Sequence, residues 1–253
     1  MNPGLPRLPA EFRLVSYDTV GSTNDEAKRL ARAGAAEGTV VWAVQQTAGR
    51  GRRGRRWLSP PGNLHASFVL RPDVAAGRAA QLGFVATLAV GDALRVIAPE
   101  PQRIAYKWPN DVMIEGRKIA GTLIESEIGE SGVLTLLVVG VGINLAVAPS
   151  DIEIAATSVA ALGGDAPTPG AMLGMLAPRF YAWLNRWRAV GFAPIRTAWL
   201  AGAASLGGSI RVRLDSAELR GRFRDIDAHG SLLLDTPAGM RRISAGEVFP
   251  VPS

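Results

Sequence analysis

The 253-residue chain contains no cysteine. Disulfide bonds, thiolate metal ligands and a cysteine nucleophile are therefore excluded. No stretch approaches the ~18 consecutive apolar residues that span a bilayer, and the N-terminus has no apolar run suited to a signal peptide. The hydrophobic fraction is nevertheless 47%, enough to bury a sizeable core. The sequence therefore predicts a soluble, cytoplasmic protein with no membrane partner.

Acidic residues are in the minority, with 22 Asp+Glu against 28 Lys+Arg and a net charge of +6. Much of the excess lies in "GRGRRGRR", residues 49–56, where five arginines stand among three glycines. Like charges placed this densely repel one another, so the segment predicts a negatively charged ligand at one local site. For the same reason we expect the segment to be disordered while it is empty.

Three glycines of this segment, Gly49, Gly51 and Gly54, match the G-x-G-x-x-G fingerprint. A dinucleotide site also needs a helix at the third glycine, whereas "RRWLSPPGN" contains two prolines and indicates a loop. Arginine, glycine and one tryptophan suit a nucleic-acid surface, but no basic helix or helix-turn-helix accompanies them. A solvated basic loop does not explain the glycines, which let backbone amides approach a ligand. The composition favours a loop that closes over a compact phosphorylated molecule.

The hydrophobic pattern predicts an α+β fold with a mixed sheet and helices on one side of it. Residues 1–11 are rich in proline and should be extended. Thr23 and Glu26 match a capping box at the start of a helix. We predict helices over 22–34, 79–98 and 168–190, the last kinked or split at Pro178. We predict strands over 38–46, 63–71, 103–108, 111–127 (a hairpin) and 132–145, the last central in the sheet.

The residue pattern changes from about residue 207. From there on, short segments of alternating polar and apolar residues, typical of strands, are separated by turn residues. This pattern is typical of a small antiparallel barrel. A domain boundary near residue 205 follows, which divides the chain into 1–204 and 205–253.

Three further segments carry polar residues that a plain core would not need: "YKWPNDVMI", "GRKIAGTLIE" and "VGVGINL". Each alone is ordinary, because a turn, a solvated lysine or close backbone packing would explain it. Their occurrence together after the Arg/Gly segment predicts a site. The residues that they contribute are Lys107, Trp108, Asn110, Asp111, Lys118, Gly121, Gly140 and Asn144.

With "GSTNDEA" and "QTAGRGRRGRRW", these segments resemble the successive motifs of the biotin–protein ligases, from about Tyr17 to the C-terminus. The resemblance implies a class II synthetase-like biotin/lipoate ligase fold. Residues 1–204 would form the catalytic biotin- and ATP-binding domain and 205–253 an SH3-like barrel. Some members carry an N-terminal DNA-binding winged helix. Here the ligase-like region starts almost at once, so the resemblance is to the ligase-only type, with no DNA partner.

The resemblance also implies residue roles, which stay expectations here. Lys118 and Arg52 would be catalytic, because they would offset the repulsion between the biotin carboxylate and the α-phosphate of ATP. Asp111 would be a metal ligand or a partner on the amine side. Biotin would contact Ser22, Thr23, Asn24, Gln46, Gly49, Arg50, Gly51, Arg52, Lys118, Gly121 and Gly140. The nucleotide would contact Arg52, Arg55, Trp57, Asn110 and Asn144.

The activity that the resemblance implies has two steps. Biotin is activated to biotinyl-5′-adenylate by ATP, with Mg²⁺ on the triphosphate, and is then transferred to a lysine of a biotin carboxyl carrier protein. A lipoate or octanoate transferase of similar fold is one alternative, although Ser22, Thr23 and Gln46 argue for a polar pocket. A nucleic-acid-binding module is another. A homodimer, paired through an exposed sheet edge, is left open.

Overall fold

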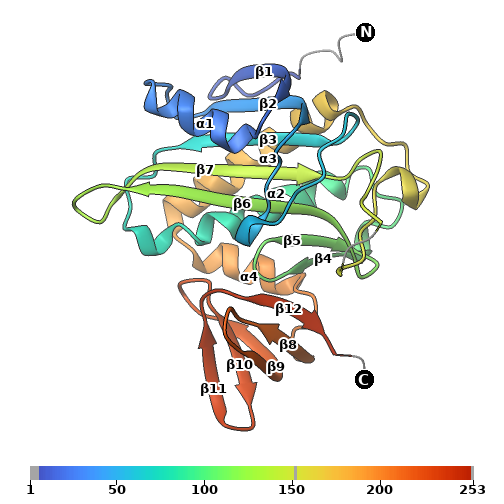
Figure 1. Ribbon diagram of the computed structural model, residues 1–253. Coiled ribbons are helices and arrows are strands. Elements are labelled where there is room, and N and C mark those ends of the chain that lie inside the picture. The colour runs from blue at the N-terminus through green and yellow to red at the C-terminus, as the bar shows by residue number, and fades with distance from the viewer. Residues whose placement is uncertain (1–5, 151–152, 252–253) are drawn as a thin grey trace.

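The computed structural model describes residues 6–150 and 153–251 of the chain. A seven-stranded sheet has the order β1-β2-β3-β7-β6-β5-β4 (Figure 1). Strands β1 and β2 are parallel and the other neighbours are antiparallel, so the sheet is mixed as predicted. Its strands are β1 (Arg13–Val20), β2 (Thr39–Gln46), β3 (Leu64–Leu70), β4 (Ile104–Lys107), β5 (Asp111–Ile114), β6 (Arg117–Ile128) and β7 (Leu134–Ile143).

Strand β7 occupies the middle of this sheet, between β3 and β6. Its sequence, "LTLLVVGVGI", is apolar on both faces, and most of its side chains are buried. A strand that is covered on both sides needs such a continuous apolar run. The glycines interrupt the run at its C-terminal end, where the sheet face must leave room for other groups.

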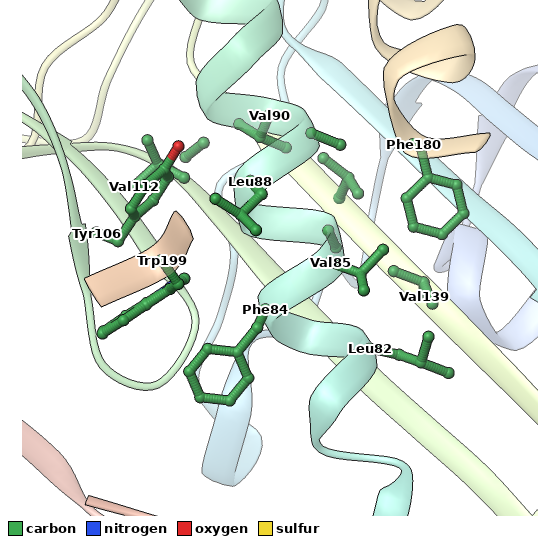
Figure 2. Packing of buried hydrophobic residues seen from close by; sticks show 14 of the residues in the cluster. Leu82, Phe84, Val85, Leu88, Val90, Tyr106, Val112, Val139, Phe180 and Trp199 are labelled. Carbon is green, nitrogen blue, oxygen red and sulfur yellow. The ribbon is translucent and has the colours of Figure 1, made fainter. Parts of the chain in front are cut away.

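Four helices accompany the sheet, and α2 is the most deeply buried of them. Its residues are apolar nearly all round, and it packs against β6, α3 and α4 (Figure 2). Phe84 of α2 packs edge-on against Trp199, and Phe180 of α3 packs against Phe68 of β3 with the ring centroids 4.6 Å apart. The helices are α1 (Thr23–Arg32), α2 (Gln81–Leu94), α3 (Pro169–Val190) and α4 (Ala193–Ala201).

Helix α1 covers the opposite face of the sheet, so the prediction that all helices lie on one side is wrong. Ala27 and Ala31 pack on Val69 and Val138, whereas α2 and α3 join the core that contains Phe68 and Val139. Adjacent strand residues point to opposite faces, which separates these two clusters. The short apolar stripe of α1 closes only part of its face and leaves the rest of the sheet open for a site.

Helix α3 runs without a break through Pro178, contrary to the predicted split. Leu176, Ala177 and Phe180 on either side of the proline are all buried, and this packing holds both halves in line. Thr168 caps the helix, because its hydroxyl accepts a hydrogen bond from the Ala171 amide at 3.2 Å. Residues 1–5 of the segment expected to be extended lie outside the described residues.

The C-terminal part forms a five-stranded antiparallel sheet of order β11-β10-β9-β8-β12, which agrees with the SH3-like arrangement. Pairings between described residues leave β11 and β12 at its edges, so no closed barrel is formed. The indole of Trp108 donates to the Gly230 carbonyl at 2.9 Å and fastens this sheet to the first part. Its strands are β8 (Ser209–Arg213), β9 (Glu218–Ile226), β10 (Leu232–Thr236), β11 (Gly239–Ile243) and β12 (Glu247–Pro250).

Candidate active site

A cavity of about 590 Å³ lies on the sheet face that α1 leaves open. Its walls come from the start of α1, the Arg/Gly loop (residues 49–57), the glycine-rich ends of β6 and β7, and the turn before β12. It brings together the predicted site residues except Gly49 and Trp108. Those that line it are Ser22, Thr23, Asn24, Gln46, Arg50, Gly51, Arg52, Arg55, Trp57, Lys107, Asn110, Asp111, Lys118, Gly121, Gly140 and Asn144.

One end of the cavity is polar and uncharged. The Thr23 amide and hydroxyl both donate to Gln46 Oε1, at 2.7 and 3.0 Å, and Gln46 Nε2 donates to Ser59 Oγ at 2.7 Å. The Thr23–Glu26 capping box is therefore wrong: Ser22 is the N-cap residue, with no side-chain capping bond, and Thr23 reaches Gln46 instead. These fixed donors and acceptors suit a neutral hydrogen-bonding ligand group.

Asn24 is oriented from two sides by residues that the sequence interpretation missed. Its amide nitrogen donates to Glu125 Oε2 at 2.7 Å, and its oxygen accepts from Ser67 Oγ at 2.6 Å. Burial alone would raise the pKa of Glu125, but hydrogen bonds from Lys28 and Asn24 lower it below its ordinary value. Ser67 is a polar residue in the apolar strand β3, and that irregularity was the available signal.

The glycines of the cavity make room for side chains of the protein as well as for a ligand. A Cβ on Gly140 would lie 2.3 Å from Asn24 Oδ1, and a Cβ on Gly142 would lie 2.5 Å from the Trp57 indole. A Cβ on Gly121 would meet Lys118 Nζ at 3.2 Å. Gly49 lies outside the cavity lining, where a Cβ would lie 2.5 Å from Ser59 Oγ. Glycine at these positions thus allows the site side chains to lie on the sheet.

The Arg/Gly loop folds back on itself, with Gly51 N bonded to Arg55 O and Trp57 N bonded to Gly49 O. Several of its arginines pair with carboxylates of the protein. The partners are Asp25 and Glu125 for Arg50, Asp215 for Arg53 and Glu247 for Arg55. Carboxylates of the protein therefore offset part of the repulsion from which a negatively charged ligand was predicted. The pairings come from residues distant in sequence, which no local pattern predicts.

Arg52 and Arg56 are the arginines of the loop that make no ion pair with any described residue, and Arg52 is the less exposed of the two. The Arg52 guanidinium donates to the Gly246 carbonyl at 3.3 Å. Burial, and then the adjacent charge of Arg53, lower the pKa of Arg52. A half-buried cation with no carboxylate partner, placed on a cavity wall, is a binding group for an anion.

A charged cluster of Lys107, Asp111 and Lys118 lines the same cavity as Arg52, and Lys107 and Asp111 are buried. Asp111 Oδ1 is 2.5 Å from Lys118 Nζ, and Oδ2 is 3.0 Å from Lys107 Nζ. Burial alone would raise the pKa of Asp111, but the two lysines lower it. Because each oxygen of Asp111 faces an ammonium group, its surroundings fit the expected amine-side role and do not fit a metal ligand.

No metal centre accompanies the cavity within residues 6–150 and 153–251, where no group of three or more His, Cys, Asp or Glu could hold an ion. The two other carboxylates on the cavity wall, Glu153 and Glu247, are both paired with Arg213. Among the described residues, the cavity wall therefore offers no free carboxylate for Mg²⁺.

The two asparagines predicted to contact a nucleotide also brace the backbone. The side-chain nitrogen of Asn110 donates to the Thr122 carbonyl, and that of Asn144 donates to the Thr157 carbonyl at 3.1 Å. Trp57 lies on the face of the sheet over the paired Gly121 of β6 and Gly142 of β7, with Lys118 Nζ 5.3 Å from its ring centroid. One wall of the cavity is thus aromatic, which suits a stacking ligand.

Comparison with known proteins agrees with this arrangement. Residues 17–144 match the biotin/lipoate A/B protein ligase family and residues 205–249 match the biotin protein ligase C-terminal domain. The chain therefore belongs to the biotin/lipoate A/B protein ligase family, as its motifs predicted. It is 48% identical to a biotin–acetyl-CoA-carboxylase ligase of Paracoccus denitrificans, over 90% of this chain and 96% of the relative. It is 33% identical to a bifunctional ligase/repressor of Bacillus subtilis, over 93% of this chain and 73% of that protein.

The fold is similar to that of a solved biotin protein ligase from Aquifex aeolicus in complex with biotin and ATP. The TM-score is 0.78 at 29% identity, and the match covers 95% of this chain and 99% of the solved one. In the described part of the chain, no helix combines the length and apolar character that crossing a membrane requires.

Proposed function

We propose that the protein is an ATP-dependent biotin–protein ligase, which forms biotinyl-5′-adenylate and transfers biotin to a lysine of a carrier domain. One observation carries the proposal: a single cavity has an uncharged hydrogen-bonding end at Thr23 and Gln46 and a cationic end at Arg52 and Lys118. A ureido ring fits the first end, and a carboxylate meeting a phosphate fits the second. The family and the relatives reported above support the same assignment.

Activation solves a leaving-group problem. A free carboxylate does not react with an amine, because oxide would have to leave, whereas AMP leaves readily from the adenylate. The biotin carboxylate oxygen attacks the α-phosphorus of ATP, and the bond to pyrophosphate breaks. Both reactants are anions, so a positive charge between them lowers the barrier. Lys118 and Arg52 both line the cavity in which the two anions would meet.

In the second step, the ε-amine of the acceptor lysine attacks the mixed anhydride, and AMP leaves. The amine loses a proton in this attack, and that proton leaves to solvent. Asp111, a carboxylate of the cavity wall that already binds two ammonium groups, would hold the incoming amine. The Arg/Gly loop covers the cavity, and exclusion of water by such a cover protects a reactive acyl-adenylate. Mg²⁺ would neutralise the triphosphate oxygens. The described residues of the cavity do not fit a protein-bound ion, so neither step above depends on one.

The acceptor in this proposal is the biotin carboxyl carrier protein of a carboxylase, and the compartment is the cytoplasm. Residues 1–204 would provide catalysis, and residues 205–253 would hold the Arg/Gly loop. We propose that the protein does not bind DNA. Pairing of two copies through the free edge of β1 remains the route by which a dimer would form.

The test is incorporation of radiolabelled biotin into a purified carrier domain with ATP, compared with labelled lipoate or octanoate. Incorporation of biotin alone is expected. Labelling by lipoate or octanoate in place of biotin would favour the transferase alternative, which requires an apolar tunnel. A gel shift with oligonucleotides at physiological salt should show no complex, and a salt-dependent complex would favour the nucleic-acid alternative.

A further inference from the structure

Lys107 has a property that the two proposed steps leave unexplained. It ends strand β4, and its side chain is only 7% exposed. Lysine is rarely buried, because an ammonium group loses much hydration in the interior. Lys107 Nζ lies 3.0 Å from Asp111 Oδ2 and 3.3 Å from the Val248 carbonyl. It thus lines the cavity beside Asp111, with its ammonium group held by that carboxylate and by the Val248 carbonyl.

The charges of this cluster do not balance. Two ammonium groups share one carboxylate, which leaves one positive charge in excess. The more exposed of the two lysines is Lys118, whose side chain is 21% exposed. If Asp111 had Lys118 as its only partner, the pair would be neutral, and Lys118 would have to give up its counter-charge to meet a ligand. Lys107 supplies a second partner, so the carboxylate stays compensated when Lys118 turns toward an anion.

We propose that Lys107 is a positioning residue that acts through Asp111 and keeps a net positive charge at the Lys118 end of the cavity. The inference rests on the proposed function, since it is the acyl-phosphate of the adenylate that this charge would hold. Each oxygen of Asp111 is engaged by one of the two lysines, so a change at Lys107 reaches Lys118 through this carboxylate. Arg52 adds charge from the loop side of the cavity.

A purely structural role is the competing explanation, because the bond from Lys107 to Val248 also ties β12 to the first part of the chain. Two substitutions distinguish the role of the Lys107 charge from the role of its hydrogen bond to Val248. Lys107→Gln keeps a donor for Val248 and Asp111 but removes the charge. Lys107→Arg keeps both. A double variant, Lys107→Gln with Asp111→Asn, removes one charge of each sign and so restores the excess positive charge without Lys107.

The experiment measures the binding of two adenylate analogues to the full-length protein by calorimetry, one with a phosphodiester linker and one with an uncharged linker of the same length. Lys107→Gln should weaken binding of the charged analogue by about tenfold or more, and that of the uncharged analogue by less than about twofold. Lys107→Arg and the double variant should restore the preference for the charged analogue.

Equal losses for both analogues, or no loss for either, would show that Lys107 is only a tether and would overturn the inference. If Lys107→Gln does not fold, the double variant decides alone, because it must keep the wild-type ratio of the two affinities. If wild-type protein binds neither analogue, the proposed function has failed, and the inference fails with it. If the wild type binds the analogues but the variants lose affinity for both equally, the inference is rejected and the proposed function stands.

Discussion

At the scale of single residues, some charged side chains of the candidate site have an ion-pair partner within the protein and others do not. Arg50, Arg53 and Arg55 each have a carboxylate within the protein, whereas Arg52 has none among the described residues. Lys118 shares its carboxylate with another lysine. Positive charge is therefore left at two points of one cavity, and a bound anion would meet both.

Lys118→Ala should abolish adenylate synthesis while biotin still binds. The ammonium group lies where two anions would react, and the polar end of the cavity that would hold the ureido ring does not involve it. We expect a rate loss of about 100-fold or more, as for other groups that stabilise transition-state charge. Formation of labelled biotinyl-adenylate and calorimetry with biotin would measure the two effects. Arg117→Ala, an exposed neighbour on β6, is the control, and a wild-type rate in Lys118→Ala would refute the assignment.

His65 should make the protein less stable in mild acid. It is buried on β3, and burial lowers the pKa of His65 below its ordinary 6.5, although a contact with the Pro60 carbonyl opposes this. The unfolded chain therefore binds a proton that the folded protein does not, so stability present above pH 6.5 falls as the pH drops toward the folded pKa. The loss is at most about 1.4 kcal/mol per pH unit.

Urea unfolding of wild type and His65→Gln at pH 7.5 and 5.5 measures this. The wild type should lose more free energy of unfolding between the two pH values, because the variant lacks the titrating group. His229→Gln, at an exposed position, should behave as wild type. Equal pH dependence in wild type and His65→Gln would show that His65 titrates alike in both states.

At the scale of elements, the sequence correctly predicted those features that depend on residues close together in the chain. The burial of β7 and of α2 was predicted because each element consists almost entirely of apolar residues. The face of the sheet that α1 covers was not predicted. It depends on which strand residues point toward Ala27 and Ala31, and those strands are distant in sequence. Pro178 does not split α3, because packing on both sides of it outweighs the lost hydrogen bond.

The site follows the same division. The motif residues were predicted together, because each segment carries its own irregular polar residues. Glu125 and Glu247 were missed, because single acidic residues on strands look solvated until the chain brings an arginine to them.

The Arg/Gly loop should couple the two substrates. If it is disordered when empty, the first ligand to order it bears an entropy loss of ~1–2 kcal/mol per fixed residue. The second ligand then binds to a loop already formed, so biotin should tighten ATP binding, and ATP should tighten biotin binding equally. Titration of a non-hydrolysable ATP analogue with and without saturating biotin measures the effect. Equal affinities would mean that the loop is preformed or is not shared.

At the scale of the whole molecule, the two sheets meet at this loop. Arg55 pairs with Glu247 at the start of β12, and Glu247 is 2.5 Å from Arg213 of β8. Arg213 in turn lies 2.7 Å from Glu153, in the segment that follows β7. Glu247 thus links the loop, the C-terminal sheet and a second cavity wall. Burial alone would raise the pKa of Glu247, but hydrogen bonds from Arg55 and Arg213 lower it.

Glu247→Gln should therefore open the Arg/Gly loop without unfolding either sheet. The loop is rich in arginine, so trypsin should cut it faster in the variant, and an adenylate analogue should dissociate at least about fivefold faster, because a part-buried charge pair is lost. Asp235→Asn removes a carboxylate of the same sheet that pairs with Arg224 instead of with the loop, and is the matched control. Lowering the pH through the folded pKa of Glu247 should open the wild-type loop in the same way, since a carboxylate with a lowered pKa loses its contribution on protonation. Equal cleavage of the two variants would mean that the C-terminal sheet does not hold the loop closed.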